Sequence, residues 1–430
     1  MASTLDILVI GGGTAGAAAA AALAQTGREV VLLESSPLEK AGARWVNGLP
    51  KGELERWGLT PPEPEHVAPF HLVAGWGPDR ITVEEPAIVD HDMRWLVQAL
   101  QGQARAAGAE LREGVRVERI EPGVDSVHVH LRGEPPLRAS FVVDAGGMTG
   151  PGPRVPCPPE RICVAAQQVR AISDLDAARS WLEKQRAKPG ETLSFGGVAG
   201  GYSIVNVHIE LEPEPTVSLL TGSIPALGHP SGVTLLDRFV QEHGWIGKER
   251  FGGARPIPLT APEPVVGRGR IARVGDAARQ VFATHGSGIA QGLRAARLLA
   301  RTLADGGGAW EYNVRFQREA GATLASSAAV AAWTATLTTA QVREMVVSGL
   351  LHPALVAEGL AQEAPSLNPS LLPDLLTSAT RQPKIAASMV PALIAAARLQ
   401  RMHHRYPSTP ERVPAWHAAR HKVLRSVGAA

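Results

Sequence analysis

The glycines near the start of the chain have the spacing of a phosphate-binding turn. A GxGxxG pattern begins at Gly11, directly after an apolar run over residues 5–10, and opens an alanine-rich run over residues 17–22. This order of strand, turn and helix brings backbone N–H groups of a helix N-terminus close to a pyrophosphate. The alternative is an alanine-rich βαβ unit that needs the glycines only for packing. The residues expected at a dinucleotide are Gly11, Gly13, Thr14, Ala15 and Gly16.

A carboxylate follows at a spacing that suits a ribose. Glu34 ends the next apolar run, residues 30–33, and lies roughly 20 residues beyond the turn, where an acid can accept hydrogen bonds from ribose hydroxyl groups. A glycine turn alone is a weak signal and admits NAD or FAD. The complete series of strand, turn, helix, strand and acid predicts a bound adenine dinucleotide.

A second signature lies much later in the sequence. Asp276 follows a strand-like run and Gly275, and the glycines 286 and 288 precede a helix with an apolar stripe. A carboxylate at a strand end can accept hydrogen bonds from sugar-alcohol hydroxyls, and N–H groups at a helix N-terminus can face an electron-rich ring. The simpler alternative is an aspartate that caps an ordinary loop.

Length and composition limit the classes of function. A chain of 430 residues can form two or three domains, and 43 basic against 41 acidic residues leave a net charge of +2, which gives no argument for a nucleic-acid partner. Cys157 and Cys163 lack the partners of a zinc site, so we expect ordinary thiols and no metal, with a redox pair as the alternative. The first residues lack a basic signal-peptide region, which favours the cytoplasm.

The hydrophobic periodicity indicates which elements position these residues. Helical spacing is expected at 90–109 and 287–303, and strands at 115–120, 127–131 and 141–143. Alternation from 162 to 258, with a helical insert near 177–188, is typical of an antiparallel sheet. The remainder after residue 308 is helical in spacing and broken by prolines.

Together, the glycine turn, the Gly275–Asp276 pair and the later glycine loop resemble FAD-dependent oxidoreductases built like para-hydroxybenzoate hydroxylase. This superfamily includes aromatic hydroxylases, tryptophan halogenases and geranylgeranyl reductases. The resemblance implies an α/β fold with a Rossmann-like FAD-binding domain over 1–160 and 259–310, an inserted antiparallel-sheet substrate domain over 161–258, and a helical C-terminal region over 311–430. Part of 40–90 would lie on the substrate side.

The resemblance also implies roles for single residues. Asp276 would bind the ribityl chain of FAD, Arg44 would lie near the adenosine and pyrophosphate, and backbone groups of the last glycine loop would face the flavin ring. The full set expected to hold FAD is Gly11, Gly13, Thr14, Ala15, Gly16, Glu34, Arg44, Asp276, Gly286, Ser287, Gly288 and Ile289.

Departures from the family patterns limit which activities of the superfamily we expect. The Asp-Gly pair that serves FAD and nicotinamide in hydroxylases is replaced by Asp144 followed by Ala145, so NAD(P)H or an external reduced flavin remains open as the electron donor. The halogenase motif Trp-x-Trp-x-Ile-Pro is absent, which disfavours halogenation. A geranylgeranyl reductase pattern is only faintly echoed at residues 200–205. The proline that this family often has before the last glycine loop is missing. The run from Phe282 to Gly286 leaves His285 close to the expected flavin ring.

We expect a monooxygenase that hydroxylates an electron-rich, aromatic small molecule through a peroxyflavin. His285 would donate or accept a proton, because imidazole titrates near neutral pH; alternatively it is a loop histidine bonded to backbone. Reduction of prenyl or polyene double bonds is the second hypothesis. The third is a maturation enzyme that oxidises a side chain, such as Trp, of a polypeptide docked on the C-terminal helices. The basic, aromatic stretch 398–425 is a solvated face or a partner surface, including peripheral membrane contact.

Overall fold

The first elements form a parallel βαβ unit, as the sequence predicts. The computed structural model describes residues 4–62, 67–363 and 369–430. β1 (Leu5–Ile10) leads through α1 (Thr14–Ala24) to β2 (Val30–Leu33), and both strands pair in parallel. α1 buries its alanines completely at residues 17–21 and contacts α2 (Met93–Ala106) and α5 (Ile289–Ala304).

Strands from distant parts of the sequence complete this sheet. β1 pairs in parallel with β10 (Glu134–Asp144), which pairs in parallel with β17 (Ile271–Arg273). Because the carboxyl ends of these strands lie at one edge, the glycine turn after β1 and the Asp276 loop after β17 meet there. The other members of the sheet are β2, β7 (Glu110–Arg112), β8 (Val117–Pro122), β9 (Val127–Leu131) and β16 (Gly267–Arg268).

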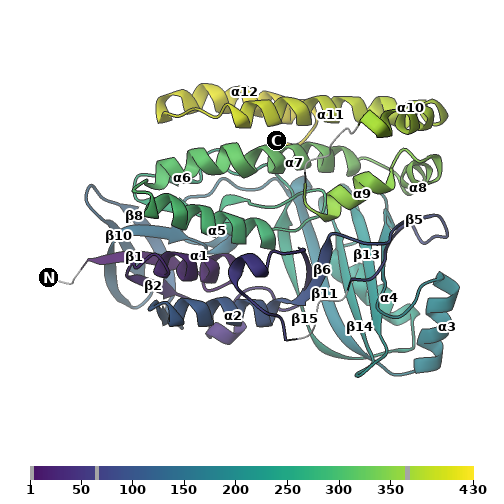
Figure 1. Cartoon of the computed structure of the whole chain (residues 1–430), viewed down its shortest axis with the longest axis horizontal. Helices are drawn as coiled ribbons and strands as arrows, with labels where there is room; N and C mark the ends of the chain where they lie inside the picture. The colour runs from purple at the N-terminus through teal and green to yellow at the C-terminus, as the bar shows by residue number, and fades with distance from the viewer. Residues whose placement is uncertain (1–3, 63–66, 364–368) are drawn as a thin grey trace.

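A second sheet of seven strands stands beside the first (Figure 1). It is antiparallel except where β12 and β4 pair in parallel. One face packs on α3 (Leu175–Gln185) and α4 (Gly232–Glu242). α4 is a helix that the alternation pattern missed; Ser231 caps it, with its hydroxyl accepting from the N–H of Thr234. In order across the sheet, the strands are β15 (Ile246–Pro258), β11 (Ile162–Ile172), β14 (Thr216–Ser223), β13 (Ser203–Glu210), β12 (Thr192–Gly196), β4 (Phe70–Ala74) and β5 (Arg80–Val83).

The two sheets are linked by a short ribbon near the start of the chain. β3 (Val46–Pro50) pairs antiparallel with β6 (Ile88–Asp92), and the chain passes between them through β4 and β5 of the second sheet. Trp45 precedes this ribbon, and its carbonyl oxygen accepts from the N–H of Met93 at the start of α2. The ribbon therefore fixes Trp45 between the two sheets.

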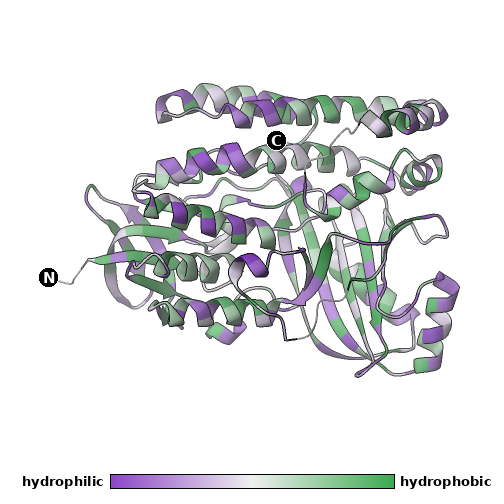
Figure 2. Cartoon of the chain, viewed as in Figure 1, coloured by the Kyte–Doolittle hydropathy of each residue, from purple (hydrophilic) through white to green (hydrophobic). Residues whose placement is uncertain are grey.

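The C-terminal helices form outer layers over α5 and along the second sheet, where α8 (Thr339–Ser348) and α9 (Pro353–Leu360) contact β4 and β5 (Figure 1). Polar and apolar residues alternate along them (Figure 2). A π-helical turn, Gln317–Gly321, joins the first two. No helix in the described part of the chain is long and apolar enough to cross a membrane. These helices are α6 (Ala309–Phe316), α7 (Ala322–Thr334), α8, α9, α10 (Leu372–Arg381), α11 (Pro383–His404) and α12 (Val413–Ser426).

The basic C-terminal stretch has one buried side and one exposed side, and most of its arginines lie on the exposed side. Arg420 on α12 is 3% exposed, and its guanidinium donates to the carbonyl of Pro262 at 2.6 Å and to Nε2 of His403 at 3.2 Å. Tyr406 is fully buried and donates to the carbonyl of Pro264. These side chains fasten α11 and α12 to the loop before β16.

Candidate functional site

A cavity of about 1250 Å³ lies between the carboxyl edge of the first sheet and one face of the second. Two of the expected FAD-binding residues do not line it. Gly16 lies beneath the turn, and Arg44 donates from the surface to the carbonyl of Glu39 at 3.0 Å. The role of Arg44 thus remains a prediction without support from the cavity lining. The expected residues that do line it are Gly11, Gly13, Thr14, Ala15, Glu34, Asp276, His285, Gly286, Ser287, Gly288 and Ile289.

The glycine turn is packed too closely for any side chain. Gly11 has φ +99°, and a Cβ there would lie 2.6 Å from the carbonyl oxygen of Ala145. A Cβ on Gly16 would lie 1.8 Å from the carbonyl oxygen of Gly11. Gly13 precedes α1 without a side-chain cap, and the first turn holds no acid. The unpaired N–H groups of this helix end therefore open toward the cavity.

Glu34 lies where the sequence predicts an acid. Its Oε2 accepts from the N–H of Gly12 at 2.7 Å, and its Oε1 accepts from the N–H and hydroxyl of Ser36 at 2.9 and 2.7 Å. Burial raises the pKa of this carboxyl, but the hydrogen bonds from Ser36 and Gly12 outweigh burial and hold the pKa below its usual value. Glu34 is thus an ionised acceptor beside the turn.

Asp276 and the start of α5 border the cavity next to α1. A Cβ on Gly292, in the first turns of α5, would lie 3.1 Å from the Cβ of Ala15, so the N-termini of α1 and α5 converge. Gly288 precedes α5 without a side-chain cap, and its first turn also lacks an acid. Burial by the cavity walls raises the pKa of Asp276, and the positive charge of Arg255 opposes this shift. The carboxyl faces the cavity rather than the outer surface.

His285 belongs to a tight loop at the cavity wall. The N–H groups of His285 and Gly286 both donate to the carbonyl of Phe282, at 3.2 and 2.8 Å. The imidazole Nδ1 is buried and has no hydrogen-bond partner among the described residues. Burial lowers the pKa of His285, although Asp90 acts in the opposite direction, so the ring is neutral at pH 7. Both interpretations of this histidine, proton transfer and a loop histidine bonded to backbone, therefore stay predictions.

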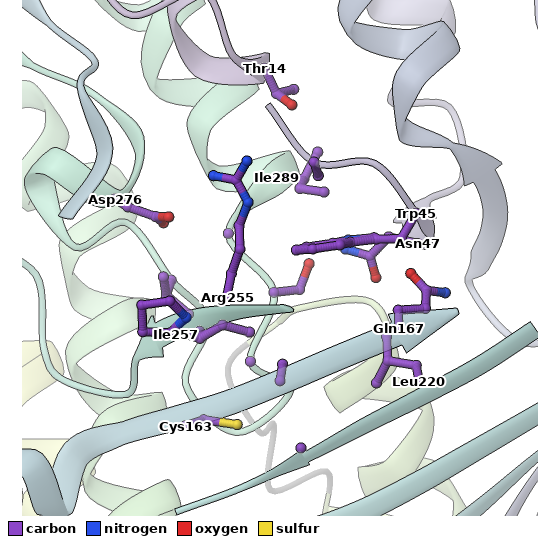
Figure 3. A pocket seen from close by; sticks show the side chains of 18 of the residues that line it. Thr14, Trp45, Asn47, Cys163, Gln167, Leu220, Arg255, Ile257, Asp276 and Ile289 are labelled. Atoms are coloured by element: carbon purple, nitrogen blue, oxygen red, sulfur yellow. The ribbon is translucent and has the colours of Figure 1, made fainter. Parts of the chain in front are cut away.

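The second sheet supplies a wall of mixed polar and apolar side chains, with Asn206, His208 and Ser218 among the polar ones. Cys163, Ala165 and Gln167 of β11 and Leu220 of β14 line the cavity, and Val342 and Met345 of α8 line it from above the sheet. Figure 3 shows Gln167 and Leu220 below the ring of Trp45. No sequence motif pointed to these residues, since only the pairing of distant strands brings them to one face.

The two cysteines are free thiols. Burial raises the pKa of Cys163 to about 12 and also raises that of Cys157. Neither environment generates the thiolate of a redox-active cysteine, which supports the expectation of ordinary thiols.

Asp144, at the end of β10, organises the loop that replaces the hydroxylase Asp-Gly pair. It is 1% exposed on its side chain and pairs with Arg154 at 2.9 and 3.0 Å. Burial raises its pKa, and the charge of Arg154 opposes that shift. Its Oδ1 also accepts from the N–H of Gly146, and Arg154 donates to the carbonyl of Gly147. The pair thereby fixes the glycine loop against the cavity.

Comparisons with known proteins agree with this geometry. Residues 9–46 match the model of the NAD(P)-binding Rossmann-like domain. No curated protein sequence matches the chain. Among solved structures, a geranylgeranyl bacteriochlorophyll reductase-like protein from Thermoplasma acidophilum superposes with a TM-score of 0.69 at 17% identity, covering 91% of this chain and 99% of its own. The chain shares its fold.

Two further structures have the same architecture. The halogenase PltM in complex with FAD matches with a TM-score of 0.63 at 16% identity, covering 99% of this chain and 96% of its own. PqsL of P. aeruginosa, solved with 2-aminobenzoylacetate, matches with a TM-score of 0.59 at 15% identity, covering 79% and 99%. The likeness to FAD-dependent oxidoreductases is confirmed at the level of the fold, and so is the predicted α/β class.

Proposed function

We propose that this chain is an FAD-dependent oxidoreductase, and specifically a monooxygenase that hydroxylates an electron-rich aromatic substrate. The observation that carries the proposal is the continuity of the cavity. It runs from two uncapped helix N-termini and two carboxylates at one sheet to the face of the other, where polar and apolar side chains are mixed. Its volume of about 1250 Å³ exceeds the roughly 300–1,000 Å³ of a single-ligand pocket, which leaves space for a cofactor and a substrate.

The residues present fit FAD. The N-terminus of α1 suits a pyrophosphate, since its N–H groups are free and no acid competes at its first turn. Glu34 suits the ribose hydroxyls and Asp276 the ribityl hydroxyls, because each is a carboxylate open to the cavity. Bound FAD would supply two-electron chemistry and reaction with oxygen, which amino-acid side chains do not provide.

His285 is the side chain that we assign to proton transfer. Its neutral imidazole lines the cavity and can accept a proton from a substrate hydroxyl at neutral pH. The adjacent backbone N–H groups of Ser287 and Gly288, at the start of α5, stabilise negative charge that develops beside them. The sheet wall and Trp45 exclude water and hold a planar ring.

Reduction of isolated double bonds is the second candidate function. It is favoured by the apolar residues Leu337, Val342, Met345 and Leu351, which line the end of the cavity under the C-terminal helices. A long prenyl chain would bury well against them, whereas a small phenol would not need them.

The deciding experiment measures cofactor, oxygen and product together. The purified chain is reconstituted with FAD, reduced with NADH, NADPH or an external reduced flavin, and supplied with phenolic or prenyl substrates. Substrate-dependent oxygen uptake with a hydroxylated product supports the monooxygenase, and anaerobic saturation of a double bond supports the reductase instead. A chain that retains no FAD would refute both.

A variant pair tests the role of His285. His285→Gln should lower turnover by about 10²–10⁴-fold while FAD stays bound, because general acid-base catalysis contributes effects of that size. His404→Gln is the matched control, since this exposed histidine lies far from the cavity lining. Equal turnover in the two variants would remove His285 from the mechanism.

A further inference from the structure

Arg255 reaches into the cavity from the second sheet. It lies on β15, where its backbone pairs with Ala165 of β11, and Ala165 faces the cavity. Figure 3 shows its side chain rising between Asp276 and Trp45, with the guanidinium directed toward Thr14 and Ile289, which begin α1 and α5. A residue of the substrate-side sheet thus points at the expected phosphate site.

Arg255 is exposed and has few partners within the protein. Its guanidinium donates to the carbonyl of Gly42 and lies 5.9 Å from the ring centre of Trp45. It makes no ion pair with a carboxylate in the described part of the chain, although its charge is felt by Asp276. Five N–H donors arranged as a planar fork therefore have one neutral acceptor, in a geometry that suits a phosphate.

The contact with Gly42 brings the guanidinium close to the glycine turn. A Cβ on Gly13 would lie 3.2 Å from the Cα of Gly42, and a Cβ on Gly42 would lie 3.4 Å from the backbone nitrogen of Thr14. The turn itself carries no basic side chain, and Arg44 lies outside the cavity. A pyrophosphate held by α1 would consequently have Arg255 on its opposite side.

Other basic side chains at the cavity are placed differently. Arg116 and Arg132 lie at the Glu34 end, since the N–H of Arg132 donates to the carbonyl of Arg116, and the neighbouring Val115 donates to Glu34. Lys40 is exposed near Gly42 and is the one rival for the phosphates among these three. It carries a point charge without the planar fork.

We propose that Arg255 binds the cofactor pyrophosphate from the sheet side and so couples the second sheet to the dinucleotide site. This inference rests on the proposed function. The cation that the superfamily resemblance assigned to Arg44 is then supplied by a residue of the other sheet. Loading of the cofactor would hold the two walls of the cavity together.

The test uses ADP, AMP and adenosine as probes, with binding measured by titration calorimetry on the full chain. We expect Arg255→Gln to weaken ADP binding by about ten- to a hundredfold, as loss of a charged hydrogen bond does, and to leave adenosine binding within about twofold. The salt dependence of ADP binding should fall in the same variant. Arg255→Lys should recover part of the affinity.

Matched controls remove one positive charge elsewhere. Lys40→Gln and Arg44→Gln should each weaken ADP binding less than Arg255→Gln does. Wild-type ADP affinity in Arg255→Gln would overturn the inference and assign this guanidinium to a substrate anion, and an equal loss for adenosine would show a structural role instead. If the wild-type chain binds neither FAD nor ADP, both the proposed function and the role of Arg255 are refuted. If it binds both, the variants test the role of Arg255 alone.

Discussion

Replacing Gly16 by alanine should damage both the fold and the phosphate site. The added Cβ would lie 1.8 Å from the carbonyl oxygen of Gly11, whereas ordinary contact begins at 3.4 Å. α1 would have to retreat from the turn by roughly 1.6 Å, about the rise of one helical residue. Because the obstructing atom belongs to the backbone, no side-chain rotation relieves the clash. Overpacking costs about 1–3 kcal/mol even where neighbours can adjust, so we expect a loss of about 3 kcal/mol.

The control for this variant is Gly102→Ala in α2. An added Cβ at Gly102 meets nothing within 4 Å, and helix propensity predicts a gain of about 0.5–1 kcal/mol. Urea unfolding followed by circular dichroism gives the free energy of unfolding of each variant. An ADP titration measures whether the glycine turn still binds phosphate. Gly16→Ala should bind ADP weakly or not at all. If it unfolds at the wild-type midpoint and binds ADP normally, the close packing of α1 on the turn is wrong.

Three further predictions concern buried groups. Burial, and then a neighbouring guanidinium, lower the pKa of His403 well below its usual value, so the unfolded chain binds more protons. The free energy of unfolding should therefore fall as the pH drops below about 6.5, by up to about 1.4 kcal/mol per pH unit. Urea unfolding at pH 7.5 and at pH 5.5 measures this difference, which His403→Gln should reduce. Arg154→Gln should cost about 3–5 kcal/mol by leaving Asp144 buried and unpaired, and adding Asp144→Asn should restore part of it. Cys163 should resist iodoacetamide at pH 8 until urea unfolds the chain, whereas Cys157, which is less buried, should label earlier; rapid native labelling of Cys163 would contradict its burial.

Local patterns predicted the glycine turn and the ends of β1 and β2 that border the cavity. The residues of β1, β2 and the turn follow from an apolar run, three glycines and an acid, because a βαβ unit is specified by neighbours in sequence. Asp276 was found in the same way, by its position after a strand. Each of these depends on backbone geometry that a short segment determines alone.

The other wall of the cavity could not be predicted in this way. Arg255 and Gln167 reach the cavity only because β15 and β11 pair in one register, and a shift by one residue would turn both away. Arg44 was expected at the phosphates from its place in a motif, yet its side chain follows the surface to Glu39. No sequence signal singled out Arg255, because β15 does not alternate between buried and exposed residues and Arg255 itself is exposed.

The sheet pairing of β10 has a consequence for how the chain is made. β10 can pair with β1 as soon as both are synthesised. Its other parallel partner, β17, is synthesised only after the whole seven-stranded sheet. Until then the nascent chain carries an open parallel strand edge, which is a template for misassociation with other chains. The loop that holds Asp276 arrives with the strand that closes this edge. Chaperone protection should therefore matter most before residue 273 emerges.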